Sequence, residues 1–327
     1  MVACSNLLKV FGARKEEDRF VIMEPLRIVF MGTPEFAVPS LEVLLKNGKN
    51  VVGVVTAEDK PRGRGQKPGA SAVKELAQKY GLNILQPSKL KSPEFIEQLN
   101  ALKADVQIVV AFRMLPEIVW AMPPMGTFNL HASLLPQYRG AAPINWAIIN
   151  GEEETGITTF FLQHEIDTGK IIFQEKEPIY ETDDAGSLYG RLMNNGAQLV
   201  LRTVDAIEKG NVKTKGQAAV EKLNHAPKIF KETCQINWNL SGRAIQNFVR
   251  GLSPYPGAWM EINGKQFKVF RITLSTETME GRPGELQSDQ NGFIRFKTAD
   301  GWVSVEELQP EGKRRMTVCE FFRGNKI

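Results

Sequence analysis

The sequence predicts an α/β fold with a mostly parallel sheet, followed by a small antiparallel β-barrel. Through the first two thirds of the chain, short apolar runs alternate with segments of helical spacing, which is the pattern of buried parallel strands joined by helices. Beyond residue 226 the pattern changes to short strands separated by turn-forming dipeptides, which is typical of small antiparallel barrels. The length of 327 residues also suits two domains better than one.

Each expected strand of the first domain is followed by a polar segment or a helix. The expected strands are 26–31, 51–56, 83–85, 105–111, 127–131, 157–162 and 170–175, and the expected helices are 36–46, 71–80, 92–102 and 186–208. Ser71 and Ser92 are expected to cap two helices, because a serine hydroxyl can accept from a free amide of the first turn. Ligands bind beyond the carboxyl ends of parallel strands, so polar residues at strand ends are the candidates for a site.

The chain divides into four predicted segments. They are an N-terminal extension at 1–24, the α/β domain at 25–208, a polar and aperiodic linker at 209–226, and the C-terminal barrel domain at 227–327. In the last segment we expect a helix at 241–252 and strands at 258–262, 266–274, 292–297 and 302–308. Asn-Gly or Asp-Gly dipeptides at 263–264, 291–292 and 300–301 indicate hairpin turns between strands. Such a barrel would be of the oligonucleotide-binding kind.

The N-terminal extension has only a short and broken apolar part. Glu16, Glu17 and Asp18 argue against a transit peptide, because such peptides are poor in acidic residues. Met23 stands just before the first convincing strand. We therefore expect Met23 to be the real or an alternative start, with residues 1–22 dispensable.

Cysteine usage, hydropathy and charge narrow the class of protein. The three cysteines are far apart and form neither a CxxC pair nor a framework, which fits the reducing cytoplasm. No run of 18 apolar residues occurs, so neither a transmembrane helix nor a membrane partner is expected.

Residues 227–327 hold 15 Lys/Arg against 11 Asp/Glu, whereas the rest of the chain is balanced. This basic excess suits a surface that docks a polyanion, although on charge alone an ordinary, slightly basic domain is the better explanation.

The segment Phe128–Gly140, FNLHASLLPQYRG, is the strongest candidate for chemistry. Asn129 and His131 are two residues apart on an expected strand, so their side chains share one face. A carboxamide and an imidazole can both donate to a carbonyl oxygen. The alternative reading is a hydrogen-bonded core histidine beside an asparagine.

The second candidate segment, HEIDTG at 164–169, follows another expected strand. Asp167 could orient His131 or accept a proton, and the alternative reading is a structural Asp-Thr-Gly turn. His164 could join Asp167 and His131 in a metal site, but neither HExxH nor CxxC occurs, so no metal is expected.

The third candidate is the basic, glycine-rich loop KPRGRGQK. Its cations, Lys60, Arg62, Arg64 and Lys67, could order against RNA phosphates. A solvated surface loop is the alternative reading.

Taken together, these segments resemble the methionyl-tRNA formyltransferase family from about Met23 to the C-terminus. The matching stretches are MGTPEFAVPSL at 31–41, GRGQK at 63–67, FNLHASLLPQYRGAAPINWAI at 128–148, HEIDTGKI at 164–171 and GLSPYPGAW at 251–259. The resemblance implies a Rossmann-like formyltransferase domain followed by a tRNA-binding barrel. One stretch departs from the family pattern: AFRM at 111–114 stands where an AYG-like sequence is expected, and Arg113 should face solvent or the folate tail.

The resemblance also implies an activity and its residues. The enzyme would transfer the formyl group of 10-formyltetrahydrofolate to the α-amino group of methionyl-initiator tRNA, as a cytoplasmic monomer without a metal. Asn129, His131 and Asp167 correspond to the catalytic trio, and Arg64 corresponds to a contact with the tRNA acceptor end. The folate contacts correspond to Ser133, Leu134, Leu135 and Pro136. The alternatives are a folate-dependent formyltransferase acting on a sugar nucleotide or amino sugar, and an RNA-binding protein that has lost catalysis.

Overall fold

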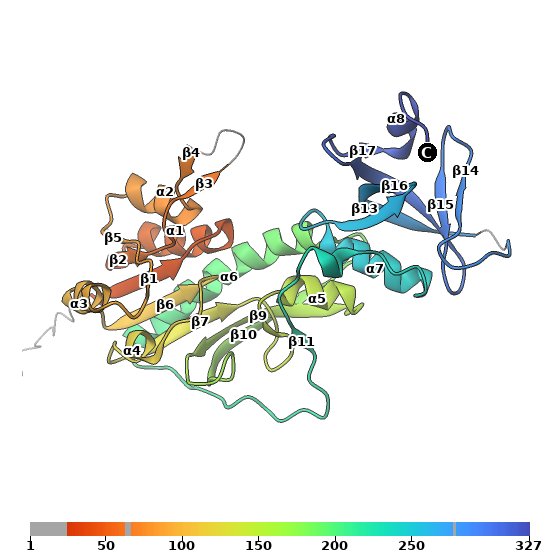
Figure 1. Cartoon of the computed structure of the whole chain (residues 1–327). Helices are drawn as coiled ribbons and strands as arrows, with labels where there is room; N and C mark the ends of the chain where they lie inside the picture. Colours follow the sequence, from red (N-terminus) through yellow and green to blue (C-terminus); the bar gives the residue numbers. More distant parts are fainter. Residues whose placement is uncertain (1–24, 63–66, 277–278) are drawn as a thin grey trace, which may run out of the picture.

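The computed structural model describes residues 25–62, 67–276 and 279–327. The predicted extension with its start at Met23 lies outside these residues, as does Arg64. The described chain has an α/β part and a C-terminal β part, each with its own hydrophobic core (Figure 1). Within the described residues, no helix is both long and apolar enough to cross a membrane.

The α/β part is built on one seven-stranded sheet. Its strands are β1 (Ile28–Gly32), β2 (Val51–Val55), β5 (Ile84–Leu85), β6 (Val106–Val110), β7 (Thr127–His131), β9 (Glu154–Phe161) and β10 (Ile171–Pro178). Their order across the sheet is β10-β9-β7-β6-β1-β2-β5. The five strands from β7 to β5 are parallel, whereas β9 and β10 run antiparallel. This arrangement confirms the predicted mostly parallel sheet.

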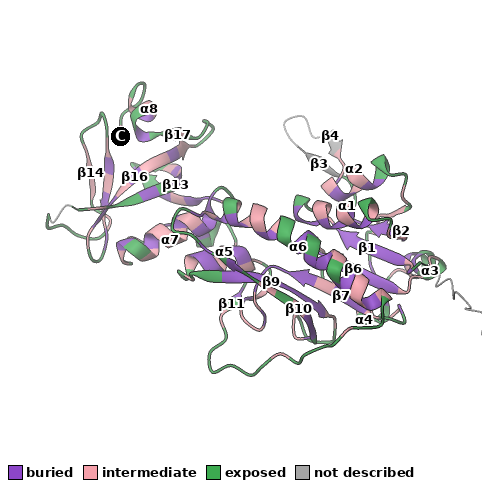
Figure 2. Ribbon diagram, turned by 180° about the vertical axis from the view of Figure 1, so that it is seen from behind, coloured by how far each residue is buried: buried purple, intermediate pink, exposed green. Residues whose placement is uncertain are grey.

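Helices cover both faces of this sheet, because successive residues of a strand point to opposite sides. Ile28 and Phe30 of β1 pack on the face covered by α1 (Val38–Lys46), α2 (Ala72–Lys79), α5 (Pro143–Ile149) and α6 (Ala185–Glu208). Val29 and Met31 pack on the other face, under α3 (Pro93–Ala101) and α4 (Glu117–Trp120). Figure 2 shows the resulting layers, with the central strands buried and α6 exposing one stripe to solvent.

The starts of most predicted helices are confirmed by their caps. The hydroxyls of Ser71 and Ser92 accept from backbone amides of α2 and α3. The predicted single helix 36–46 is split into a 3₁₀ turn, η1 (Glu35–Ala37), and α1. Pro39 sits in the first turn of α1, where its missing N–H costs nothing, which is why the regular helix starts there.

The C-terminal part joins one helix to a curled antiparallel sheet. Its elements are α7 (Gly242–Leu252), β12 (Ala258–Ile262), β13 (Lys265–Ser275), β14 (Leu286–Ser288), β15 (Ile294–Lys297), β16 (Trp302–Pro310), β17 (Met316–Thr317) and α8 (Val318–Phe322). The strand order is β12-β13-β16-β15-β14, with β17 beside β16. No pairing joins β12 to β14 among the described residues, so the sheet is a half-barrel of the predicted OB-like kind.

The predicted hairpin at 263–264 is confirmed in detail. Asn263 and Gly264 link β12 to β13 with φ of 50° and 73°, which are the two positive angles of a type I′ turn. Packing of α5 against α7 joins the two parts, and Asn145 donates from Nδ2 to the carbonyl of Gly251 at 2.7 Å.

Two segments that looked irregular in the sequence form strand pairs. The flanks of the predicted basic loop pair as an antiparallel hairpin, β3 (Lys60–Arg62) with β4 (Lys67–Gly69). In the predicted linker, β11 (His225–Ala226) pairs with β8 (Arg139–Gly140) in the α/β part. A further short element, η2 (Glu232–Cys234), precedes α7. The linker is therefore attached to the first domain along much of its length.

Candidate active site

The candidate site forms on one face of β7 under a returning loop. Phe128 and Leu130 point into the core beneath α6, so Asn129 and His131 point to the opposite face. The loop between β9 and β10 folds back over this face and carries Asp167. His131 thus ends a parallel strand as predicted, whereas Asp167 arrives from an antiparallel hairpin.

The structure brings His131 and Asp167 together. His131 Nδ1 lies 3.9 Å from Asp167 Oδ2, and the two side chains are 7% and 12% exposed. That separation is too long for a hydrogen bond and lies near the upper limit of an ionic contact. The backbone N–H of Gly140 donates to the same carboxylate oxygen at 3.0 Å. The other oxygen accepts no hydrogen bond from the described residues.

The backbone sets the tautomer of His131. Its Nε2 lies 2.9 Å from the carbonyl oxygen of Tyr138. A carbonyl only accepts, so Nε2 carries the hydrogen, and Nδ1 is the nitrogen whose protonation can change. The ring nitrogen without a backbone partner among the described residues is therefore the one that faces Asp167.

Asn129 lies two residues before His131 on the same face of β7 and is half-buried. Its carboxamide makes no hydrogen bond within the described part of the chain. A donor that is held by a sheet and has no protein partner is available to a ligand.

The backbone around the site is strained. Ala111, Tyr138 and Asp167 have φ of 47°, 59° and 55°, values that side chains other than glycine rarely adopt. Ala111 directly follows β6, whereas Tyr138 and Asp167 lie in the loops that follow β7 and β9. Such strain persists only where neighbouring contacts hold it, and it concentrates at functional sites.

The loop expected to contact folate is held rigidly to β9. The Ser133 hydroxyl is buried and donates to the carbonyl of Gln137 at 2.6 Å, and Thr158 Oγ1 donates to the carbonyl of Ser133 at 2.6 Å. Leu135 is buried, whereas Leu134 and Pro136 are half-buried. The side chain of Ser133 is therefore already engaged, and this loop would meet a ligand mainly through its backbone.

A cavity of about 420 Å³ opens beyond the carboxyl ends of β1, β2 and β6. Its lining residues are Thr33, Pro34, Ala57, Glu58, Pro87, Ala111, Phe112 and Arg113. Arg113, at the predicted departure from the family pattern, donates to the carbonyls of Pro87 and Ser88. It remains exposed, and its polar end is turned to the backbone at the rim of the cavity.

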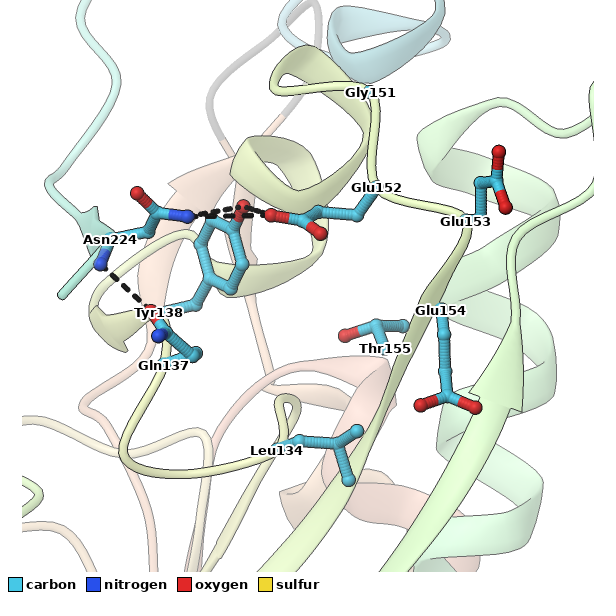
Figure 3. A pocket seen from close by; sticks show the side chains of 9 residues that line it. All are labelled: Leu134, Gln137, Tyr138, Gly151, Glu152, Glu153, Glu154, Thr155 and Asn224. Atoms are coloured by element: carbon cyan, nitrogen blue, oxygen red, sulfur yellow. Dashed lines mark hydrogen bonds between the residues drawn. The ribbon is translucent and has the colours of Figure 1, made fainter. Parts of the chain in front are cut away.

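A second cavity, of about 560 Å³, lies behind the loop that follows β7 (Figure 3). At one end the Tyr138 hydroxyl donates to Glu152, and Asn224 Nδ2 donates to the same carboxylate oxygen at 3.3 Å. Burial, together with the neighbouring Glu152 carboxylate, raises the pKa of Tyr138 to about 12. Tyr138 is therefore a neutral donor at physiological pH and anchors the loop whose carbonyl holds His131.

Two functional candidates were missed at the sequence level, and both lie in the predicted linker. Gln217 donates from Nε2 to the carbonyl of Asp167 at 2.8 Å. The backbone carbonyl of Asn224 accepts a hydrogen bond from the backbone N–H of Tyr138 at 2.7 Å. Because the linker is polar and aperiodic, no pattern in the sequence distinguishes these two residues from their neighbours.

The remaining candidates are placed apart from His131 and Asp167. His164 Nε2 lies 3.2 Å from Glu117 Oε1, and both side chains are largely exposed. Among the described residues, no group of three or more His, Cys, Asp or Glu could hold a metal ion. Lys60, Arg62 and Lys67 share the β3–β4 hairpin, whose first strand follows Glu58 at the rim of the smaller cavity.

Comparisons with known proteins agree over both parts of the chain. The formyl transferase family model matches residues 26–204, and the formyl transferase C-terminal domain model matches 228–326. The methionyl-tRNA formyltransferase of Bacteroides fragilis is 53% identical over 92% of this chain and 95% of its own. That of Flavobacterium johnsoniae is 51% identical over 92% and 97%.

Solved structures share the fold at lower identity. The N-formyltransferase of Helicobacter canadensis, in complex with folinic acid and dTDP-3-aminofucose, aligns with a TM-score of 0.66 and 22% identity over 87% of this chain and 99% of that one. HypX of Aquifex aeolicus, in complex with tetrahydrofolic acid, aligns with a TM-score of 0.62 and 20% identity over 92% and 48%. The family models and the high identity over nearly the whole length lead to one conclusion. The chain belongs to the methionyl-tRNA formyltransferase family.

Proposed function

We propose that this enzyme transfers the formyl group of 10-formyltetrahydrofolate to the α-amino group of methionyl-initiator tRNA. The observation that carries the proposal is the meeting of His131 and Asp167 on the face of β7 that also presents Asn129. A carboxamide, an imidazole and a carboxylate can together manage an acyl transfer. Family membership supports the choice of substrates.

The reaction begins with a neutral amine. A free α-amine has a pKa of about 7.7–8.0, and esterification of the adjacent carboxyl lowers it further, so much of the substrate is deprotonated at neutral pH. The amine nitrogen bonds to the formyl carbon and then releases one proton. Asp167 lies at the site with one oxygen unengaged by described residues, so it can accept that proton directly or through water.

Attack places negative charge on the formyl oxygen. Asn129 and protonated His131 project from the same strand face and are positioned to donate to that oxygen. The bond between the formyl carbon and folate N10 then breaks, and N10 needs a proton. His131 Nδ1 is the nitrogen free to deliver it, since Nε2 is committed to the carbonyl of Tyr138.

The residues proposed to contact tRNA lie in two parts of the chain. The β3–β4 hairpin and the C-terminal sheet rise from the same side of the α/β sheet in both views (Figures 1 and 2). The C-terminal residues 227–327 carry the net positive charge of the chain. We assign Lys60, Arg62, Arg64 and Lys67 to the tRNA acceptor end, and the half-barrel to another part of the same RNA. A monomeric enzyme in the cytoplasm is part of the same proposal.

The test uses the purified full-length protein with formyl-tetrahydrofolate and charged initiator tRNA. Formyl-methionine released from the tRNA is the expected product, and an amino-sugar nucleotide assayed in parallel should stay unmodified. Product from the sugar alone would replace the acceptor in this proposal. RNA binding without any formyl transfer would overturn catalysis.

A further inference from the structure

We propose that Gln217 is a positioning residue for this reaction and that the segment joining the two domains completes the active site. The inference rests on the proposed function, because it assigns Asp167 a part in catalysis. Gln217 touches no substrate in this scheme. It acts by fixing where Asp167 stands relative to His131.

Every polar atom of the Gln217 side chain is engaged at the site. Its Nε2 donates to the carbonyl of Asp167 at 2.8 Å and to the carbonyl of Gly169 at 3.0 Å. Its Oε1 accepts from Arg139 Nε at 3.1 Å and also from Nη2. One amide therefore ties the Asp-Thr-Gly turn to the strand that follows the His131 loop.

These bonds support an arrangement that the local chain does not favour. Asp167 has φ of 55°, which a non-glycine residue holds only under constraint. At Gly169 a Cβ would stand 1.6 Å from the carbonyl oxygen of Phe161, so the turn is pressed against β9. Gln217 fixes the backbone of Asp167, and the N–H of Gly140, next to Arg139, holds its carboxylate. The position of Asp167 is therefore fixed both at its backbone carbonyl and at its carboxylate.

The linker, residues 209–226, also fixes the position of His131. The carbonyl of Asn224 accepts from the N–H of Tyr138 at 2.7 Å, and Tyr138 in turn presents its own carbonyl to His131. The backbone N–H of Asn224 donates to Gln137 Oε1 at 2.8 Å, and Figure 3 shows how its side chain reaches Tyr138 and Glu152. The linker thus supports His131 and Asp167 independently, at two points seven residues apart.

The attachment continues into the second domain. Gly140 has φ of 126°, and a Cβ there would lie 2.4 Å from the carbonyl oxygen of Ala226, so β8 and β11 touch through their backbones. Trp146 Nε1 donates at 2.8 Å to the carbonyl of Pro227, the first residue of the predicted C-terminal domain. The segment that supports His131 and Asp167 is therefore held to the α/β part up to the first residue of the C-terminal domain.

The test compares Gln217→Ala and Gln217→Glu in the full-length enzyme. Alanine removes all four hydrogen bonds, whereas glutamate keeps the acceptor for Arg139 and loses both donors to the turn. We expect kcat to fall roughly 10- to 100-fold in both variants, as misplacement of a catalytic group by about 1 Å does. KM for tRNA should change by less than about threefold, because no tRNA contact is removed. Val220→Ala, an exposed change three residues away, is the matched control and should keep wild-type kcat.

A double-mutant cycle with Asp167→Ala separates positioning from a general structural role. If Gln217 acts through Asp167, adding Gln217→Ala to Asp167→Ala should cost little more than Asp167→Ala alone. Additive losses, or wild-type kcat in both single variants, would overturn the inference. Loss of folding in both variants would also overturn it, since Gln217 would then serve the fold. An inactive wild-type enzyme would instead refute the proposed function, so the two failures are distinguishable.

Discussion

Asp183, which is buried, and Asp167, which is half-buried, each lie beside a basic side chain, yet their surroundings differ. Asp183 sits at the junction of the two domains, where both of its oxygens bind the Arg191 guanidinium at 2.7 Å. The Ser187 hydroxyl and the N–H of Tyr180 also donate to it. Burial alone would raise its pKa, but these hydrogen bonds, led by Arg191, outweigh that effect and lower the pKa of Asp183 to about 2.

Asp167 has a much looser environment. One of its oxygens accepts a single backbone hydrogen bond and lies 3.9 Å from His131, and the other has no partner among the described residues. The difference separates two uses of the same chemical group. A saturated carboxylate stabilises the join between elements, whereas an incompletely satisfied one keeps capacity for a proton or a substrate.

The largest effects on activity are expected at the candidate catalytic residues. We expect Asn129→Ala, His131→Ala and Asp167→Ala each to lower kcat by roughly 10²–10³-fold, which is the usual cost of losing a donor or acid-base group at an acyl transfer site. Affinity for tRNA should stay within about twofold, because none of these side chains meets the RNA surface. The measurements are formylation kinetics, which give kcat, and a separate binding assay, which gives the affinity for tRNA. Near-wild-type turnover in all three would remove the assignment.

At the junction the expected effect is on stability. Asp183→Asn should lower the free energy of unfolding by about 2–3 kcal/mol at pH 7 and leave kcat of the folded enzyme unchanged. The pKa of Asp183 is lowered on folding from 3.8 to about 2, so its stabilisation is complete well above pH 4 and is lost as the pH falls towards 2. Urea unfolding at pH 7 and pH 3 should therefore show a smaller difference between mutant and wild type at pH 3. If the stability difference between Asp183→Asn and wild type were the same at both pH values, the ionised Asp183 carboxylate would not be the source of the stabilisation.

The basic hairpin gives a smaller and salt-dependent effect. Arg64→Ala should raise KM for tRNA roughly 3- to 10-fold at low ionic strength and reduce the salt slope of binding by about one. Lys176→Ala is the control, since Lys176 lies on β10 at the opposite end of the sheet and, among the described residues, pairs only with exposed Glu154. Equal responses of the two variants across a salt titration would argue against a specific contact by Arg64.

The smallest expected effect is a change in the stability of the C-terminal half-barrel, caused by substitutions outside the candidate site. Gly264→Ala places a Cβ in open space at φ of 73°, so it should cost only backbone strain, about 1 kcal/mol, and a few degrees in Tm. Gly301→Ala, also in open space but without a positive φ, should be neutral or slightly stabilising. Calorimetry on both, together with an unchanged kcat, would confirm that the half-barrel and the catalytic face are independent.

Much of the fold was readable from local pattern. The buried strand Thr127–His131 and the strand Ala258–Ile262 match the predicted bounds, because continuous or alternating apolar residues define strands directly. The serine caps and the Asn263–Gly264 turn also followed from their own chemistry. The helix expected at 36–46 is confirmed from Val38 to Lys46, but its first residues form a 3₁₀ turn ahead of Pro39.

What the sequence did not reveal depends on distant partners. The two-residue strands β8 and β11 exist only because Gly140 and Ala226, far apart in the chain, meet. Likewise, nothing near Gln217 indicates that it will reach Asp167, since that contact spans 50 residues. The roles of Asn129, His131 and Asp167 came from resemblance and stay predictions, although the approach of His131 to Asp167 is what those roles require.

The attachment of the joining segment also determines where this chain can be divided. A fragment ended at Glu208, the last residue of α6, would contain every strand of the large sheet and still lack Gln217, Asn224 and the pairing partner of β8. Anyone preparing the α/β portion alone, or grafting it onto another RNA-binding module, should retain the sequence through Ala226. Replacement of residues 209–226 by a flexible spacer of equal length would preserve the connection but discard the support.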